Sequence, residues 1–346
     1  MAAKDYLSGS HEESLQFKPR HYICPRAPFE LDTADGNLDK PFWQNAPFSE
    51  EFLDIEWDAK PKPYHRTRMK MQWDDKYLYI GAMLEENQIW ATVTERDATI
   101  YVDPDFEVFI DPDGDTHNYY ELEINALNTL WDLLLLKPYR DGGPFIVGWD
   151  IRGVKTGVRI MGKLNDPASV NENKGWSVEL ALPWRILGEC AGKRTPPQQG
   201  DYWRIDFSRV EWRTEIRDGK FQKVVNPETG RPYGEDNWIW SPIGAVDMHR
   251  PEFWGFLVFA DNAQESFTIP QVEYTKWTLR RLYYRERIYF SQHGRYCADW
   301  TELTGGNTEG VSPQIAVTPT LFEASLPNPD GSGQVVIFND GKVIVK

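Results

Sequence analysis

The sequence predicts an all-β protein, an antiparallel β-sandwich of the jelly-roll or immunoglobulin-like type with a smaller C-terminal module. Short segments of alternating apolar and polar residues recur through the first 260 residues, with turn residues between them. A long helical pattern occurs once, in the last quarter of the chain. We therefore expect an extended lead-in at residues 1–27, the sandwich at 28–265, and a module of one helix and short strands at 266–346.

The clearest predicted hairpin lies at residues 66–85. In RTRMKMQW, Met69, Met71 and Trp73 alternate with polar residues, which is typical of a half-buried strand. After an acidic turn, YLYIGAMLE is apolar on both alternations and predicts a central strand.

Further strands are predicted at short intervals along the sandwich. They are FEVFID (106–111), NYYELEINAL (118–127) with WDLLLL extending its pattern, and the segments 153–162, 176–182, 203–210 and 254–259. PWRILGECAG (183–192) predicts a helix of one or two turns.

The C-terminal module begins with a predicted helix that ends at Gly294, a residue type common just after a helix. Its Leu279, Leu282, Tyr283 and Tyr289 lie near one helical face. The strands QIAVT, LFEASL, QVVIF and KVIVK follow, and Asn-Asp-Gly joins the last two as a hairpin turn. We expect this module to pack on the sandwich.

The composition excludes several classes of protein. With 53 Asp and Glu against 38 Lys and Arg, the net charge of −15 would repel a phosphate backbone, so nucleic acid is not expected as a partner. No apolar run is long enough to cross a membrane. The start of the chain lacks a secretory signal pattern, so we expect a secreted or periplasmic protein only if a signal was removed.

The three cysteines show no metal spacing and are expected to be free or buried thiols.

Motifs for nucleophilic or nucleotide-dependent catalysis do not occur. The sequence contains no GxSxG, Walker or GxGxxG motif, and its six histidines form no zinc-type pair.

Several blocks, taken in order, resemble family 9 carbohydrate-binding modules. They are LDTADGNLDKPFWQNAP, WDDKYLYIGAMLEE, DPDFEVFIDPDGDTHNYYELEINALNTLWD, WSVELALPWRIL and WSPIGAVDMHRPEFWGFLVF, which together span residues 31–259. The resemblance implies a β-sandwich that binds an oligosaccharide or polysaccharide, often between aromatic rings, with structural calcium in some members and no required cofactor. Relatives in the superfamily bind haem and other non-carbohydrate ligands, so the fold transfers better than the ligand.

A sugar site needs flat rings for stacking and planar hydrogen-bonding groups beside them. The ring candidates, each near a strand end or in a polar segment, are Trp90, Trp131, Trp212, Trp238 and Trp240.

A polar row on neighbouring strands is the predicted ligand site. Alternation places Glu107 on one face of its strand and Glu121, Glu123 and Asn125 on one face of the next. If the sheet order follows the family, Arg96, Asp97 and Arg209 lie close to this row. A solvated face or a buried salt-bridge network is the alternative.

Carboxylates in and before the predicted turn that follows residues 106–111 are candidate calcium ligands. Asp111 and Asp113 begin a DPDGD segment like the first half of a calcium loop, but Thr116 and Leu122 stand where such a loop needs Gly and Glu. A hairpin turn is therefore favoured there, and Asp103 and Asp105 are further candidates.

The leading hypothesis is a non-catalytic glycan-binding protein. The alternative is an acid–base enzyme of the lyase, cyclase or isomerase type on the same fold, with His249, His117, Tyr120 or Glu107 as acid or base. A third possibility is a structural or assembly role for the C-terminal module.

Overall fold

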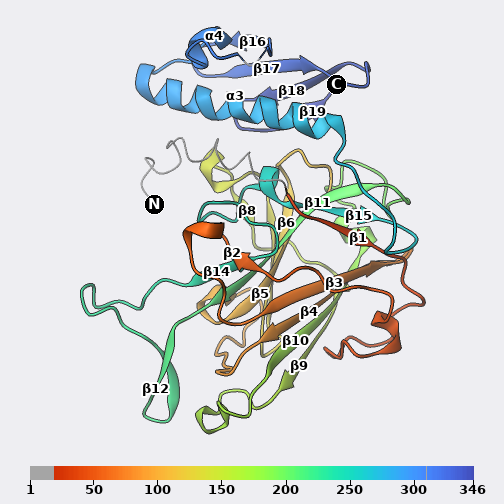
Figure 1. Cartoon of the computed structure of the whole chain (residues 1–346), viewed down its shortest axis with the longest axis vertical. Helices are drawn as coiled ribbons and strands as arrows, with labels where there is room; N and C mark the ends of the chain where they lie inside the picture. The colour runs from red at the N-terminus through yellow and green to blue at the C-terminus, as the bar shows by residue number, and fades with distance from the viewer. Residues whose placement is uncertain (1–18, 309) are drawn as a thin grey trace.

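In the computed structural model, which describes residues 19–308 and 310–346, two β-sheets pack face to face as a sandwich (Figure 1). The larger sheet has the order β1-β15-β11-β5-β6-β7-β8, and β14 and β2 continue from β11. Its strands are β1 (His21–Cys24), β2 (Leu53–Asp54), β5 (Asp105–Asp111), β6 (Tyr119–Asn125), β7 (Leu130–Leu135), β8 (Phe145–Ile146), β11 (Tyr202–Glu211), β14 (Asp236–Ile239) and β15 (Gly255–Phe259). The smaller sheet has the order β3-β4-β10-β9, formed by β3 (Thr67–Trp73), β4 (Tyr77–Glu85), β10 (Gly175–Pro183) and β9 (Lys155–Met161). The all-β sandwich prediction is confirmed.

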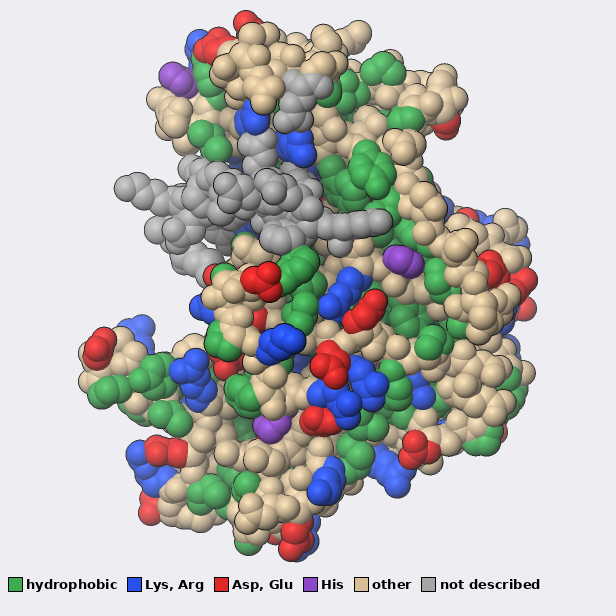
Figure 2. Space-filling model, in the orientation of Figure 1, with side chains coloured by type: hydrophobic (Ala, Val, Ile, Leu, Met, Phe, Trp, Pro, Cys, Tyr) green, Lys and Arg blue, Asp and Glu red, His purple; other side chains and the backbone are tan. Residues whose placement is uncertain are grey.

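Short elements complete the sandwich. They are the helix α2 (Trp184–Leu187), the projecting hairpin β12 (Thr214–Arg217) and β13 (Lys220–Lys223), and the 3-10 turns Pro41–Trp43, Trp57–Ala59, Ile100–Val102, Tyr139–Asp141, Pro167–Ser169 and Pro251–Phe253 (Figure 1). Acidic and basic side chains are interspersed over the visible face of the sandwich (Figure 2).

The main core lies between the two sheets. Met69, Met71 and Trp73 of β3 are fully buried there, as their alternation predicts, and they meet Val108 and Ile110 of β5 within one apolar cluster. Burial of a side chain of this size stabilises the fold by about 1.5–3 kcal/mol.

The outer face of the smaller sheet is also covered, so β3 is not the half-buried strand that the sequence predicts. Lys70 and Gln72 are buried, and their side chains donate hydrogen bonds of 3.0 and 2.8 Å to the carbonyl oxygens of Leu38 and Phe42. The segment 31–46 forms its own apolar cluster against this face. Alternation in β3 could not reveal a cover that comes from another part of the chain.

Two local predictions differ from the structure. WDLLLL does not extend the strand before it, because β6 ends at Asn125 and a turn returns the chain as the antiparallel strand β7. The side-chain oxygen of Asn125 accepts hydrogen bonds from the N–H groups of Leu127 and Thr129, which fixes this turn. Of the predicted lead-in, residues 1–18 lie outside the described part, while β1 pairs in parallel with β15.

The C-terminal module lies over the outer face of the larger sheet (Figure 1). It contains α3 (Gln271–His293), α4 (Trp300–Leu303), β16 (Gln314–Val317), β17 (Phe322–Pro327), β18 (Gln334–Phe338) and β19 (Val343–Val345). Gly294 ends α3 with a φ of 67°, a left-handed conformation that glycine adopts without strain.

One apolar cluster joins the module to the sandwich. Phe109, Tyr119 and Leu133 on the outer face of the larger sheet pack with Leu279 and Leu282 of α3 in this cluster. The two parts therefore share a core.

A buried ionic network also joins the two parts. Arg140 Nη2 lies 3.0 Å from Glu252 Oε2, and the hydroxyl of Tyr284 in α3 donates to the same carboxylate. Burial opposes the ionisation of Glu252, but Arg140 and Arg280 together lower its pKa to about 2. Glu252 is therefore ionised at neutral pH and compensates the buried guanidinium groups.

Two further features concern the chain as a whole. Cys24, Cys190 and Cys297 are free thiols, and Cys24 and Cys297 are buried, as expected. Within the described residues, no helix is both long and apolar enough to cross a bilayer.

Replacing Glu252 by Gln should lower the free energy of unfolding by about 1–3 kcal/mol at pH 7, because it removes the carboxylate beside the buried Arg140 Nη2 and leaves Asp141, 3.4 Å from Arg140 Nε, as the remaining partner. The pKa of Glu252 is lowered in the folded state, so its contribution is present above about pH 4.5 and is lost as the pH falls towards 2. Urea unfolding of the wild type and Glu252→Gln across this pH range measures both effects. The exposed Glu172, replaced by Gln, is the control and should leave stability unchanged. Equal stability of wild type and Glu252→Gln at pH 7 would contradict the assignment.

Candidate functional site

A cavity of about 560 Å³ opens on the outer face of the larger sheet, over β5, β6 and β7, and we call it the acidic hollow. Its lining includes the carboxyl side chains of Glu107, Glu121, Glu123 and Glu235, the rings of Tyr101, Phe109, Trp131, Tyr139 and Phe145, and the imidazole of His249. The polar row predicted from Glu107, Glu121 and Glu123 thus lines a single cavity together with Trp131.

Strand register explains why these side chains meet. Glu107 of β5 lies directly opposite Glu123 of β6, and Glu123 lies opposite Trp131 of β7. Residues opposite one another across antiparallel strands have their Cβ atoms about 4.5–5.5 Å apart on the same face. Glu121 is two residues from Glu123 and therefore shares that face.

The carboxyl groups of the hollow are nearly buried. Glu107, Glu121 and Glu123 are 6, 5 and 2% exposed. Burial raises the pKa of Glu107 to about 7, and burial together with the charge of Glu107 raises the pKa values of Glu121 and Glu123 well above the usual range. No Lys or Arg is among the described residues that line the hollow, so protein cations do not offset these charges.

Aromatic rings surround the carboxyl groups. Tyr101, Tyr139 and Phe145 are each 43% exposed; the two tyrosines lie in 3-10 turns, and Phe145 lies in the short edge strand β8 of the larger sheet. Their exposed faces suit the apolar C–H surface of a sugar ring. Trp131 is half-buried, and its indole N–H has no hydrogen-bond partner among the described residues.

His249 sits at the wall of the hollow as a neutral imidazole. Its Nδ1 lies 2.9 Å from the hydroxyl oxygen of Tyr119, and its ring centroid lies 4.4 Å from that of Tyr139. Burial lowers the pKa of His249 to about 4.

Arg209 and Trp240 lie away from the hollow. Arg209 is fully buried and pairs with Glu86 and Glu211 at 2.8 and 2.6 Å. Its neighbour Ser208 lies opposite Glu107, so alternation turns Arg209 to the inner face of the sheet. Trp240 is fully buried in the main core and has no face for a ligand.

Asn125, Arg96 and Asp97 also do not line the hollow. Asn125 is fully buried, and its amide donates to the Val93 carbonyl oxygen while its oxygen holds the β6–β7 turn. Arg96 contacts the carboxylates of Asp97, Asp132 and Asp150, which holds it beside β7. These groups organise the loops near the sheet.

Trp90 and Trp212 both lie near one lysine of the projecting hairpin. The ammonium of Lys223 is 3.1 Å from the ring centroid of Trp212 and 5.9 Å from that of Trp90. Lys223 thus covers one face of the Trp212 ring. Burial lowers the pKa of this lysine to about 8.

His117 and Tyr120, which the enzyme hypothesis includes, are built into other parts of the structure. His117 Nε2 lies 3.4 Å from Asp340 Oδ2 under the last hairpin of the module. Tyr120 points to the inner side of the sheet, where its hydroxyl donates to the Leu187 carbonyl oxygen at 3.0 Å. Glu107 and His249 are the two members of that set that meet in the hollow.

Two of the predicted calcium ligands form a hairpin turn. Asp111 accepts hydrogen bonds from the N–H groups of Gly114 and Thr116, and one oxygen each of Asp111, Asp113 and Asp115 lie within 4.8 Å of one another. Asp103, by contrast, accepts from the N–H and hydroxyl of Thr92 and so fixes the loop after β4. Asp105 lies beside Glu107 and Glu123 beneath the hollow.

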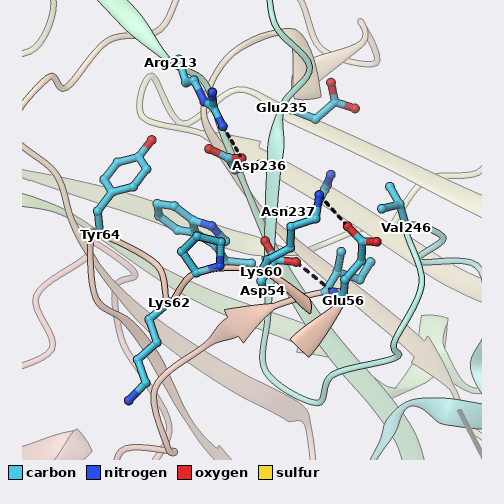
Figure 3. A pocket seen from close by; sticks show the side chains of 13 residues that line it. Asp54, Glu56, Lys60, Lys62, Tyr64, Arg213, Glu235, Asp236, Asn237 and Val246 are labelled. Carbon is cyan, nitrogen blue, oxygen red and sulfur yellow. Dashed lines mark hydrogen bonds and ion pairs between the residues drawn. The ribbon is translucent and has the colours of Figure 1, made fainter. Parts of the chain in front are cut away.

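A second cavity, of about 450 Å³, adjoins the acidic hollow, and we call it the Tyr64 hollow (Figure 3). Tyr64 is 59% exposed, and its ring meets the buried Trp238 edge-on at 4.8 Å. An Arg213–Asp236 contact of 3.8 Å and a Lys60–Glu56 ion pair of 3.0 Å border the cavity. Glu235 and Asn237 line both hollows.

The residues that complete these cavities have no strong signal in the sequence. Tyr64, Tyr139, Phe145 and Glu235 lie in loops or in a two-residue strand, where periodicity carries no information. Their only signal is an aromatic or acidic residue within a segment rich in Pro, Gly and charged residues, as in KPKPYHR and KPYRDGGPF.

Comparison with known proteins identifies the family. The family model described as "Carbohydrate family 9 binding domain-like" matches residues 34–258. No curated protein matches the chain. A candidate carbohydrate-binding protein from Bacteroides uniformis is 16% identical, with a TM-score of 0.49 over 70% of this chain and 100% of its own.

Two further structures are of a family 9 carbohydrate-binding module from Caldicellulosiruptor kristjanssonii, in complex with cellotriose and with glucose. Each is 14% identical with a TM-score of 0.42, and each comparison covers 73% of this chain and 99 or 100% of the other. Because the family model covers well over half of the 346 residues, the chain belongs to the carbohydrate family 9 binding domain-like family.

Proposed function

We propose that the protein binds a carbohydrate in the acidic hollow. The observation that carries this proposal is that four carboxyl side chains and several exposed ring faces line one cavity of about 560 Å³. Membership of a carbohydrate-binding family supports the ligand class.

The chemistry of the hollow suits a sugar. Rings at its mouth can stack on the C–H face of a pyranose, and carboxyl groups at its floor can bond to hydroxyl groups. A carboxyl group that keeps its proton both donates and accepts a hydrogen bond, which matches a hydroxyl in either role. The raised pKa of Glu107, about 7, is compatible with both states near neutral pH.

The two adjoining hollows favour an oligosaccharide over a single sugar. Glu235 and Asn237 belong to both linings, so a chain of sugars that fills the acidic hollow would continue towards Tyr64. Tyr64 offers an exposed ring at that end.

Replacing Trp131 by Ala should weaken glycan binding at least tenfold, because a stacking surface at the floor of the hollow is lost. Ligands are first found on an array of neutral and acidic oligosaccharides, and affinities are then measured by isothermal titration calorimetry. Trp149 is a matched control, since it stacks on Tyr120 outside the hollow, and Trp149→Ala should bind as the wild type does. Silence of the folded wild type across the array would refute the proposal.

Replacing Tyr64 by Ala should affect long ligands only. We expect the wild type to bind a tetrasaccharide more tightly than a disaccharide of the same series, and Tyr64→Ala to remove that difference while disaccharide affinity is unchanged. Titration of both variants with a length series of the oligosaccharide found on the array measures this. Equal losses for both lengths would show that Tyr64 is not a separate subsite.

Acid–base chemistry on the bound sugar is a second candidate function, favoured by the presence of Glu107 and His249 in the same hollow. Prolonged incubation of the protein with its bound oligosaccharide, followed by mass spectrometry, tests this. New products that disappear with both Glu107→Gln and His249→Asn would indicate an enzyme. An unchanged oligosaccharide would leave binding as the function.

A further inference from the structure

The lining of the acidic hollow contains carboxyl groups without a matching cation. Four of its side chains are carboxyl groups, and no Lys or Arg is among the described residues of the lining. His249 also lines the hollow, but burial lowers its pKa to about 4, so it is neutral at pH 7. Buried charges in proteins are normally paired, so this lining favours a ligand that brings a positive charge.

The neighbouring Tyr64 hollow differs in this respect (Figure 3). Lys60 pairs with Glu56 at 3.0 Å, and Arg213 contacts Asp236 at 3.8 Å, so these two carboxylates have cations from the protein. Of the two hollows, the acidic hollow is therefore the one in which the ligand has to supply the cation.

One buried carboxyl oxygen of the acidic hollow also lacks a hydrogen-bond donor. Glu121 is 5% exposed, and its Oε2 accepts no hydrogen bond from the described residues. Glu123, two residues along the same strand face, accepts from the Tyr101 N–H at 3.0 Å through its Oε2. A buried acceptor without a donor is unfavourable, and a primary ammonium group carries three N–H donors with which to satisfy such acceptors.

Aromatic rings stand beside these carboxyl groups. Tyr101, Tyr139 and Phe145 line the hollow with 43% of their surface exposed, and Trp131 lies opposite Glu123 in the strand register. A cation within about 6 Å of the face of an aromatic ring is attracted to it. The same ring faces accept the C–H surface of a sugar. The hollow therefore has the surfaces that a sugar with a positively charged substituent requires.

We propose that the acidic hollow selects a glycan that carries a protonated primary amine, such as an oligosaccharide of glucosamine. This inference rests on the proposed glycan binding and adds the substrate class to it. The ammonium group lies against Glu121 and Glu123 and donates to their carboxyl oxygens, while the sugar ring lies against the aromatic rings. The next sugar of the chain lies towards the Tyr64 hollow and needs no charge of its own.

Three matched ligands test the inference. They are the β-linked tetrasaccharides of glucosamine, N-acetylglucosamine and glucose, which differ in one ring substituent: an ammonium, an acetamide or a hydroxyl group. Isothermal titration calorimetry of the full chain, slightly below neutral pH so that the amine is protonated, measures the three affinities. We expect the glucosamine tetrasaccharide to bind at least about tenfold more tightly than either of the others, because it alone supplies the missing cation.

Two carboxyl variants assign the selectivity to the acidic hollow. Glu121→Gln should lower the ratio of glucosamine to glucose affinity at least about tenfold, because it removes a buried carboxyl partner of the ammonium group. Glu121 is repelled by Glu107, so this variant should fold, and circular dichroism verifies this. Glu235 lines the hollow but is exposed, so Glu235→Gln should fold in any case and lower the ratio roughly two- to fivefold. The matched control is Glu172→Gln, an exposed carboxyl group outside the hollow, which should keep the wild-type ratio.

The results separate this inference from the proposed function. Equal affinities for the three tetrasaccharides, or a preference for glucose or N-acetylglucosamine, would overturn the inference and support glycan binding. Silence towards all three, while another glycan of the array binds, would do the same. A glucosamine preference that is unchanged in both carboxyl variants would also overturn the inference, because the amine would then lie outside the acidic hollow. Silence across the whole array would overturn the proposed function itself.

Discussion

Both faces of the larger sheet carry apolar side chains that must be buried. The smaller sheet covers the inner face, and the way in which the outer face is covered determines where the acidic hollow lies. Strands β5, β6 and β7 carry Phe109, Tyr119 and Leu133 on that face, where the C-terminal module packs over them. The same face carries Glu107 and Glu123, where the module leaves a cavity. The hollow is therefore the part of one sheet face that the module does not fill. The Glu252–Arg140 pair at the junction helps to keep that boundary in place.

This arrangement accounts for the unusual electrostatics of the site. Carboxylates on an open sheet face would be solvated and would keep ordinary pKa values. Here the segments that carry Tyr101, Tyr139 and Phe145 and the segment around His249 surround them, so they lose water without gaining a cation from the protein. The site thus favours ligands that bring hydroxyl groups, a positive charge or both.

Much of the fold and part of the site could be predicted from the sequence, for reasons that follow from local periodicity. The alternation in FEVFID and YYELEIN determines that Glu107, Glu121 and Glu123 share a face, and the structure agrees. The same alternation predicts that Asn125 shares this face, but Asn125 ends its strand and its side-chain oxygen accepts the hydrogen bonds that hold the next turn. To predict that Arg209 faces away from the hollow, one needs the register of β11 against β5. No local sequence pattern contains that register. To predict that Tyr64 and Tyr139 line the cavities, one needs to know how the connecting segments fold over the sheet. To predict that Trp240 is buried, one needs the order of the strands around the core.

The parallel pairing of β1 has a consequence for solubility. Without β1, the backbone of Gly255–Phe259 in β15 would form one edge of the larger sheet, and its residues are apolar. An uncovered apolar edge strand is a template for pairing with another molecule and hence for aggregation. β1 adds four residues along this edge, beginning at His21. The strand β1 thus protects the sheet from self-association. Loss of β1 would cause precipitation before it changed the acidic hollow, which lies on the other side of β11.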